Sequence, residues 1–190
     1  MSLEKRLDNL KQLIQTHEFL EGKGLSNEVN IRIFCYDAKD EIVVDDFIQK
    51  LVKNRSLNCN IRECNLYKIF LSICEDARIL DKIPNMESRE GANSLMKRLT
   101  TAINARYFVN KINYEPHCKG DILLITGVGN VFPFIRIHSL LEALQPYFSD
   151  IPILVMYPGE FNGYQLKLFN KLQPNNYYRA FNAIYTKEDK

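Results

Sequence analysis

The segment Asp121-Ile-Leu-Leu-Ile-Thr126 runs directly into Gly127-Val-Gly-Asn130, and this junction decides the fold class. A short, nearly continuous apolar run predicts a strand that is covered on both faces, as the strands of parallel sheets are. The two glycines predict a tight turn, and the apolar spacing of residues 134–144 predicts a helix after it. The junction is therefore typical of an α/β protein with a parallel sheet.

The rest of the chain repeats this alternation of strand and helix. Upstream, we expect strands over residues 29–37 and 60–66, each followed by a helix with one apolar face, and Pro84 closes the second unit. Residues 87–113 predict one long surface helix or two shorter ones. Downstream, we expect a buried strand over 152–157, a turn at Pro158-Gly159, a helix over 166–172 and a last strand over 177–184.

This order of elements predicts a three-layer, Rossmann-like α/β sandwich with a mainly parallel sheet of about five strands, since parallel neighbours need crossover helices. Because no linker interrupts the pattern, we expect residues 1–190 to form one domain with a disordered tail over 186–190. An amphipathic helix is predicted over about residues 2–20, with Leu3, Leu7, Leu10 and Ile14 on one stripe. We expect this apolar stripe to pack against its own domain, and the alternative is that it binds a partner protein.

Composition and charge exclude several classes of protein. Lys plus Arg number 25 against 23 for Asp plus Glu, and this net charge of +2 weighs against direct DNA binding, although the second half of the chain is mildly basic. No stretch has the length and hydrophobicity of a membrane span or a signal peptide. Five cysteines without a CxxC pair indicate reduced thiols, so we expect a cytoplasmic protein.

The glycine turn lies where α/β proteins bind phosphate, because glycines let backbone N–H groups approach an anion. Phe132 stands where the dinucleotide fingerprint has its third glycine, and Asn130 and Val131 replace the lysine and hydroxyl residue of a P-loop. A tight turn is therefore the favoured interpretation. The alternative is a degenerate nucleotide-fold regulator that binds a phosphate-bearing ligand at Thr126, Gly127, Gly129 and Asn130.

The chain lacks the residue spacings of common catalytic and metal sites. The three histidines, His17, His117 and His138, show no zinc-ligand spacing, and no nucleophile motif is present. Carboxylates gather over residues 37–46, where they complement the start of a helix, with a carboxylate metal site as the alternative. We therefore expect a protein without catalytic residues, metal or cofactor.

Candidate partner-binding residues follow the glycine turn and recur near the C-terminus. Arg136 and His138 adjoin a cluster of aromatic residues, although His138 and Glu142 also have the spacing of a simple surface pair. Aromatic and basic residues mix over 157–181, which favours core or protein-interface anchors over a platform for stacked bases. The candidates are Phe132, Arg136, His138, Tyr157, Tyr178 and Arg179.

Four sequence blocks resemble the BrxB family, whose small proteins are encoded in bacterial BREX phage-defence loci. The blocks are LEGKGLSNE at 20–28, TGVGNVFPFIRIHSLLEALQP at 126–146, YPGEFNG at 157–163 and NNYYRAF at 175–181. The resemblance covers nearly the whole chain and is strongest after Asp121. It implies a non-enzymatic adaptor that acts with larger BREX proteins: first an alkaline-phosphatase-like PglZ, otherwise a BrxC ATPase or a PglX DNA methyltransferase.

Overall fold

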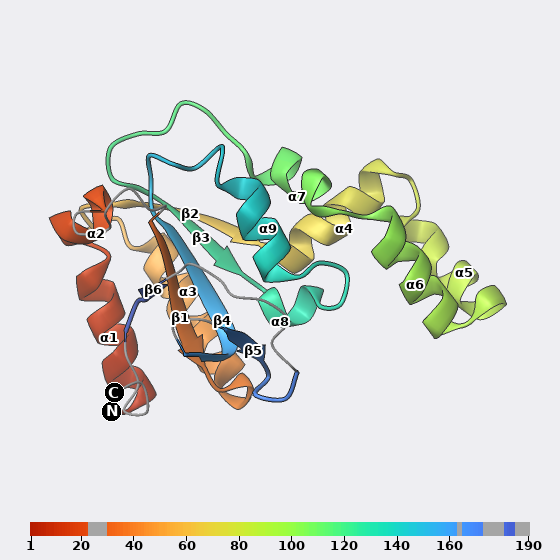
Figure 1. The fold of residues 1–190 in the computed structure, drawn as a ribbon, viewed down its shortest axis with the longest axis horizontal. Helices are drawn as coiled ribbons and strands as arrows, with labels where there is room; N and C mark the ends of the chain where they lie inside the picture. Colours follow the sequence, from red (N-terminus) through yellow and green to blue (C-terminus); the bar gives the residue numbers. More distant parts are fainter. Residues whose placement is uncertain (23–29, 163–164, 173–180, 185–190) are drawn as a thin grey trace.

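The computed structural model describes residues 1–22, 30–162, 165–172 and 181–184. Within them the chain forms a three-layer α/β sandwich (Figure 1), which confirms the predicted fold class. A sixth strand, β5, pairs antiparallel with the end of β4. The others pair in parallel in the order β2-β3-β4-β1-β6, with bounds β1 Ile31–Tyr36, β2 Asn60–Asn65, β3 Asp121–Thr126, β4 Ile153–Phe161 and β6 Phe181–Asn182; β5 spans Leu166–Leu168.

The central strands are buried on both faces. In β3, Leu123 and Ile125 belong to one hydrophobic core, while Ile122 and Leu124 belong to the other, and each is at most 1% exposed. Because helices cover both faces, neither side of the strand meets water. This is why the apolar run of β3 is continuous rather than alternating.

The first face of the sheet is covered by α1 (Leu3–Leu13), α2 (His17–Glu21) and α3 (Glu41–Lys53), and the short η1 (Ala38–Asp40) connects β1 to α3. Leu7, Leu10 and Ile14 are at most 4% exposed and pack in this core, so the helix stripe docks onto its own domain as expected. The Arg6 guanidinium donates to the Cys35 carbonyl at 2.6 Å. The prediction of one helix over 2–20 is wrong, because the Thr16 hydroxyl accepts from the Phe19 N–H and begins a second helix.

The second face is covered by α4 (Leu66–Asp76), α7 (Ala105–Ile112), α8 (Val128–Val131) and α9 (Ile137–Leu144), while η2 (Leu80–Lys82), α5 (Ile83–Glu90) and α6 (Ala92–Ala102) extend sideways from the sheet (Figure 1). Of the two alternatives predicted for residues 87–113, two shorter helices are confirmed as α6 and α7, and the last turn of α5 precedes them. Gly91, with φ of +81°, separates α5 from α6, and the Asn104 side chain caps α7. Pro84 lies in the first turn of α5 rather than closing the preceding unit, since that position needs no N–H donor.

The end of β4 also differs from the prediction. Pro158 continues the parallel pairing with β1 opposite Tyr36, and Gly159 pairs with Leu168, so Pro158-Gly159 is strand rather than turn. A Cβ at Gly159 would overlap the Lys167 carbonyl oxygen, so only glycine allows this approach. The predicted helix over 166–172 is β5 followed by a turn with positive φ at Phe169. β6 lies inside the predicted last strand, whose residues 177–180 are outside the described residues.

Candidate functional site

The glycine turn lies at the carboxyl edge of the sheet, directly after β3. Gly127 adopts a left-handed conformation with φ of +69° and begins α8, which is only four residues long. The Asn65 side chain, which caps α4 by accepting from the Lys68 N–H, lies so close that a Cβ on Gly127 would be 2.9 Å from Asn65 Oδ1. Both the conformation and the contact require glycine.

Gly129 faces a packed neighbour rather than open space. A Cβ on Gly129 would lie 2.9 Å from the Phe169 ring and 3.0 Å from the Pro158 ring, because the turn after β5 folds over α8. Thr126 is buried and donates its hydroxyl to Glu63, while Asn130 is exposed. These contacts favour the tight-turn interpretation over the phosphate-binding one.

Carboxylates from two elements, α3 and β2, gather at the same edge of the sheet. Glu41, at the start of α3, accepts from the Tyr36 hydroxyl at 2.8 Å, and Glu63, near the end of β2, accepts from the Thr126 hydroxyl at 2.8 Å. Burial raises the pKa of the Glu41 carboxyl, and the negative charge of Asp45 adds to this. Burial, followed by the charge of Glu63, raises the pKa of Asp45, while Lys68 opposes the shift.

The raised pKa values show what this edge can do chemically. Asp45 and Glu63 repel each other, so a cation placed near both would relieve that repulsion. Within the described part of the chain, no three His, Cys, Asp or Glu side chains are arranged to hold a metal ion. Lys68 of the same chain already supplies one positive charge near Asp45.

Exposed apolar side chains flank these carboxylates. Ile42 is 83% exposed and Val43 48% exposed on the first turn of α3, and Tyr67 is 40% exposed on the first turn of α4. We call these three residues, together with Asp45 and Glu63, the carboxyl-edge surface. At 83% exposure, the Ile42 side chain contributes little to the core of its own chain.

An aromatic stack links the carboxyl-edge surface to the segment after the glycine turn. The Phe70 ring lies 4.2 Å from the Phe134 ring and 6.4 Å from the Tyr67 ring, measured between centroids. Phe134 precedes α9, which begins at Ile137, so the predicted helix over 134–144 starts later than expected. The stack places the segment around Phe132 and Arg136 beside α4.

The predicted partner-binding residues divide into three groups. Arg136 is exposed at the start of α9, Phe132 is half-buried against the core, and His138 Nδ1 lies 4.0 Å from Glu142 Oε2, the pairing that the spacing suggested. Tyr157 is only 3% exposed within β4, and burial raises the pKa of its hydroxyl, so we correct its assignment: it is a core residue rather than a surface anchor. Tyr178 and Arg179 lie outside the described residues.

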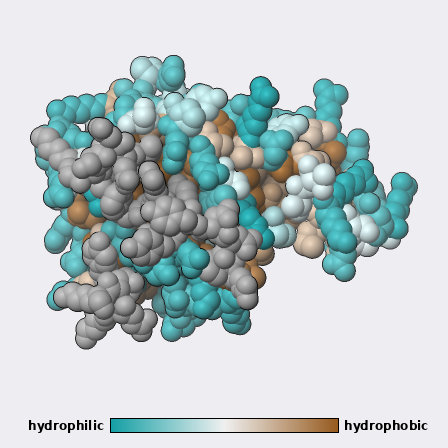
Figure 2. Space-filling model, in the orientation of Figure 1, coloured by the Kyte–Doolittle hydropathy of each residue, from teal (hydrophilic) through white to brown (hydrophobic). Residues whose placement is uncertain are grey.

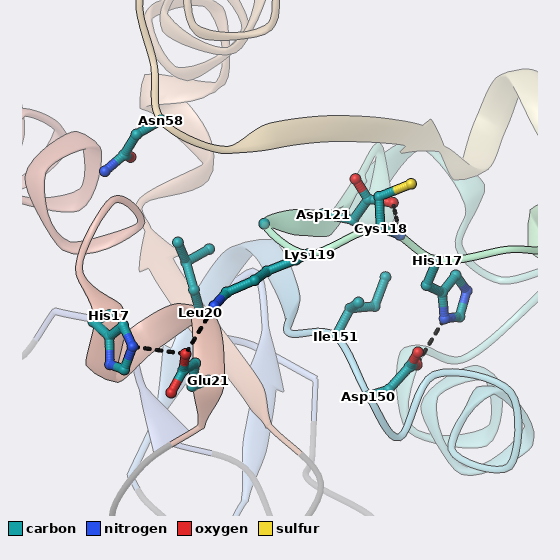
Figure 3. A pocket seen from close by; sticks show the side chains of 11 residues that line it. His17, Leu20, Glu21, Asn58, His117, Cys118, Lys119, Asp121, Asp150 and Ile151 are labelled. Atoms are coloured by element: carbon teal, nitrogen blue, oxygen red, sulfur yellow. Dashed lines mark hydrogen bonds and ion pairs between the residues drawn. The ribbon is translucent and has the colours of Figure 1, made fainter.

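A pocket of about 650 Å³ opens at the opposite, amino-terminal edge of the sheet (Figure 3). One wall carries His117, which is 5% exposed in its side chain and lies 2.7 Å from Asp150 between Nδ1 and Oδ1. The other wall carries His17 and Glu21 of α2, 2.6 Å apart, with Lys119 at 3.6 Å from the same carboxylate. Paired charges thus line the pocket from segments more than 90 residues apart in sequence.

Asp121 lies at the base of this pocket and is held by three donors. Burial alone would raise the pKa of its carboxyl, but the Cys118 N–H at 2.9 Å, the Asn60 amide at 3.1 Å and the Tyr114 hydroxyl at 3.1 Å lower it below its ordinary value. From the sequence alone, His117 is considered only as a zinc ligand, for which its spacing is unsuitable. No local signal could have found the pocket, since its walls meet only after β2, β3 and β4 pair.

The fold and the carboxyl edge define an α/β protein of Rossmann-like architecture whose glycine turn is closed by its own side chains. None of the described helices is long and apolar enough to cross a membrane. The family profile described as BREX protein BrxB matches residues 62–183. The chain belongs to this family.

Two curated relatives extend the match over nearly the whole chain. A BREX protein BrxB of Bacillus cereus (strain H3081.97) is 34% identical over 96% of this chain and 97% of its own length. A BREX protein BrxB of Escherichia coli O9:H4 (strain HS) is 28% identical over 96% of this chain and 92% of its own length. No solved structure matches the chain significantly.

Proposed function

We propose that this protein is a non-enzymatic adaptor of a BREX phage-defence complex and that it binds a PglZ-like subunit through the carboxyl-edge surface. Membership of the BrxB family supports the role in phage defence. The observation that carries the adaptor role is Ile42, which is 83% exposed beside carboxylates whose pKa values are raised.

The chemistry of the carboxyl-edge surface indicates what the partner presents. Ile42, Val43 and Tyr67 provide apolar contact area, and protein interfaces place such side chains at their centre. Lys68 offsets part of the repulsion between Asp45 and Glu63, and a basic group of the partner would lower it further. The partner segment is therefore apolar with an arginine or lysine, and Arg136 on the neighbouring segment pairs with an acidic group at the rim.

The non-enzymatic role rests on how the polar groups at this edge are used. Glu41 is engaged by Tyr36, Glu63 by Thr126, and the glycine turn is covered by Asn65 and Phe169. These groups stabilise the edge of the sheet, and a backbone covered in this way offers an anion little access.

Size-exclusion chromatography with light scattering tests the proposal on the full chain mixed with the PglZ-like protein of its own locus. We expect a stoichiometric complex that Ile42→Arg disrupts. Val52→Arg is the matched control, since Val52 is 38% exposed on the same helix, about 15 Å further along it. Separate elution of the two wild-type proteins would reject the PglZ pairing, and the BrxC-like ATPase and PglX-like methyltransferase would be tested next.

A further inference from the structure

Two helices hold a concentration of positive charge that the total charge conceals. Residues 91–114, which include α6 and α7, contain Lys97, Arg98, Arg106 and Lys111 and no Asp or Glu. α6 lies on the part of the molecule that extends sideways from the sheet, whereas α7 packs on the second face, and Figure 2 shows hydrophilic side chains at the outer end of the extended part. Local charge density, rather than the total, decides whether a polyanion is attracted.

A surface pocket of about 320 Å³ opens on this segment at the start of α7. It is lined by two amides, one guanidinium and one phenol, and by no carboxylate: Asn104, Arg106, Tyr107 and Asn110. Tyr107 is 49% exposed, whereas its neighbour Phe108 is fully buried in the core. The Tyr107 ring therefore projects outward from a helix whose packing is carried by other residues.

The charges at the pocket are not neutralised by the chain itself. Among the described residues, neither the Arg106 guanidinium nor the Lys97 ammonium has an ion pair. Arg98 and Lys111, by contrast, contact Glu90 at 2.9 Å and Asp76 at 2.6 Å on the exposed rim, where such pairs are weak and exchange with other anions. One unpaired guanidinium, that of Arg106, thus lines the pocket together with the exposed Tyr107 ring.

We propose that this α7 surface, formed by Asn104, Arg106, Tyr107 and Asn110, binds single-stranded nucleic acid. Arg106 contacts a phosphate, Tyr107 stacks on a base, and the Asn110 amide hydrogen-bonds to the sugar-phosphate backbone or a base edge. A duplex hides its base faces from Tyr107, and an acidic peptide has no planar ring to cover it. A single strand can contact the positive charge, the aromatic ring and the amide at the same time.

This proposal goes beyond the adaptor role and uses different residues. It is tested with the full chain alone and a fluorescein-labelled 20-nucleotide oligothymidylate, by anisotropy between 50 and 200 mM KCl. We expect binding that weakens with salt, with a slope in log K of about −0.7 for each phosphate neutralised, and Arg106→Ala to reduce the slope by about that amount. Tyr107→Ala should weaken binding at least about fivefold, because one stacked base is lost.

Matched control variants distinguish binding at this surface from non-specific binding elsewhere on the protein. Tyr147→Ala removes a tyrosine that is 47% exposed after α9, and Arg55→Ala removes an exposed arginine beyond the end of α3; both should leave the affinity unchanged. Circular dichroism checks that every variant is folded. The proposal would be overturned by equal losses of affinity for Tyr107→Ala and Tyr147→Ala, or by no binding at 50 mM KCl. It would also be overturned if duplex bound more tightly than single strand, or if polyglutamate displaced the probe as effectively as oligothymidylate. None of these results depends on complex formation with a PglZ-like protein.

Discussion

Replacing Gly129 with alanine tests whether the glycine turn is built for packing. The new Cβ would lie 2.9 Å from the Phe169 ring and 3.0 Å from the Pro158 ring, whereas unstrained carbon contacts are about 3.5–4.0 Å. Both rings must move by about half an ångström or more. Overpacking of this kind costs about 1–3 kcal/mol, and the better helix propensity of alanine returns at most about 1 kcal/mol, since Gly129 lies in α8.

We therefore expect Gly129→Ala to lower the free energy of unfolding by about 1–2 kcal/mol, which corresponds to a fall in melting temperature of roughly 2–8 °C for a chain of this length. Because the protein contains no tryptophan, circular dichroism during urea and thermal unfolding is the suitable assay. Gly91→Ala is the control. A Cβ there meets nothing within 4 Å, so its cost comes from the φ of +81° alone.

A double-mutant cycle identifies the source of the loss. In a Phe169→Ala background the ring contact is gone, so Gly129→Ala should cost at least about 0.5 kcal/mol less than in the wild type, while the cost of Gly91→Ala should not change. An identical cost of Gly129→Ala in both backgrounds would refute the packing argument. The ligand-binding interpretation predicts instead that ATP or another nucleotide raises the wild-type melting temperature and that Gly129→Ala abolishes this rise.

Three other predictions follow from buried groups. Leu10→Ala should cost about 2–5 kcal/mol in urea unfolding because Leu10 is fully buried, whereas the exposed Gln12→Ala should cost little; equal small effects would mean that α1 is not docked. Because the pKa of the Asp121 carboxyl is lowered in the folded state, its ionised form stabilises the fold at pH values above its ordinary pKa, and this stabilisation is lost as the pH falls through the folded pKa. The loss of stability that Asp121→Asn causes at pH 7 should therefore shrink below about pH 4. A loss that does not change with pH would contradict this. A thiol reagent should label one cysteine in the folded chain and none in Cys118→Ser, because only Cys118 is exposed and burial raises the pKa of Cys64 to about 11; labelling of Cys64 in the folded variant would contradict this.

Local pattern predicted the elements well where one segment carries a complete signal. The apolar run of β3, the glycine turn after it and the stripe of Leu7, Leu10 and Ile14 were all identified correctly. Boundaries were missed where a single capping residue or a distant strand decided the conformation. Thr16 divides the N-terminal helix, and pairing with β4 makes Leu166–Leu168 a strand although its spacing suits a helix.

The candidate site was only partly predictable, because its residues come from separate segments. Arg136 and Phe132 could be chosen from their place after the glycine turn. Ile42 and Tyr67 could not, since each is one of several apolar residues in its helix, and only the packing decides which of these are buried. The prediction that Tyr157 is a surface anchor was wrong for the same reason. Whether an aromatic residue near the end of a strand is exposed depends on which elements pack over it, and Tyr157 lies in the core on the second face of the sheet.

The sequence by itself determined that this chain is an α/β protein of the BrxB family, because the periodicity of apolar residues sets which faces are buried and four sequence blocks carry the resemblance. Only the tertiary structure decided which residues share an edge. The order β2-β3-β4-β1-β6 brings Asp45, Glu63 and Thr126 together at the carboxyl edge and His17 and His117 to one pocket at the other. The physical reason is that strand order follows from the joint packing of both helical layers, and no single segment contains that information.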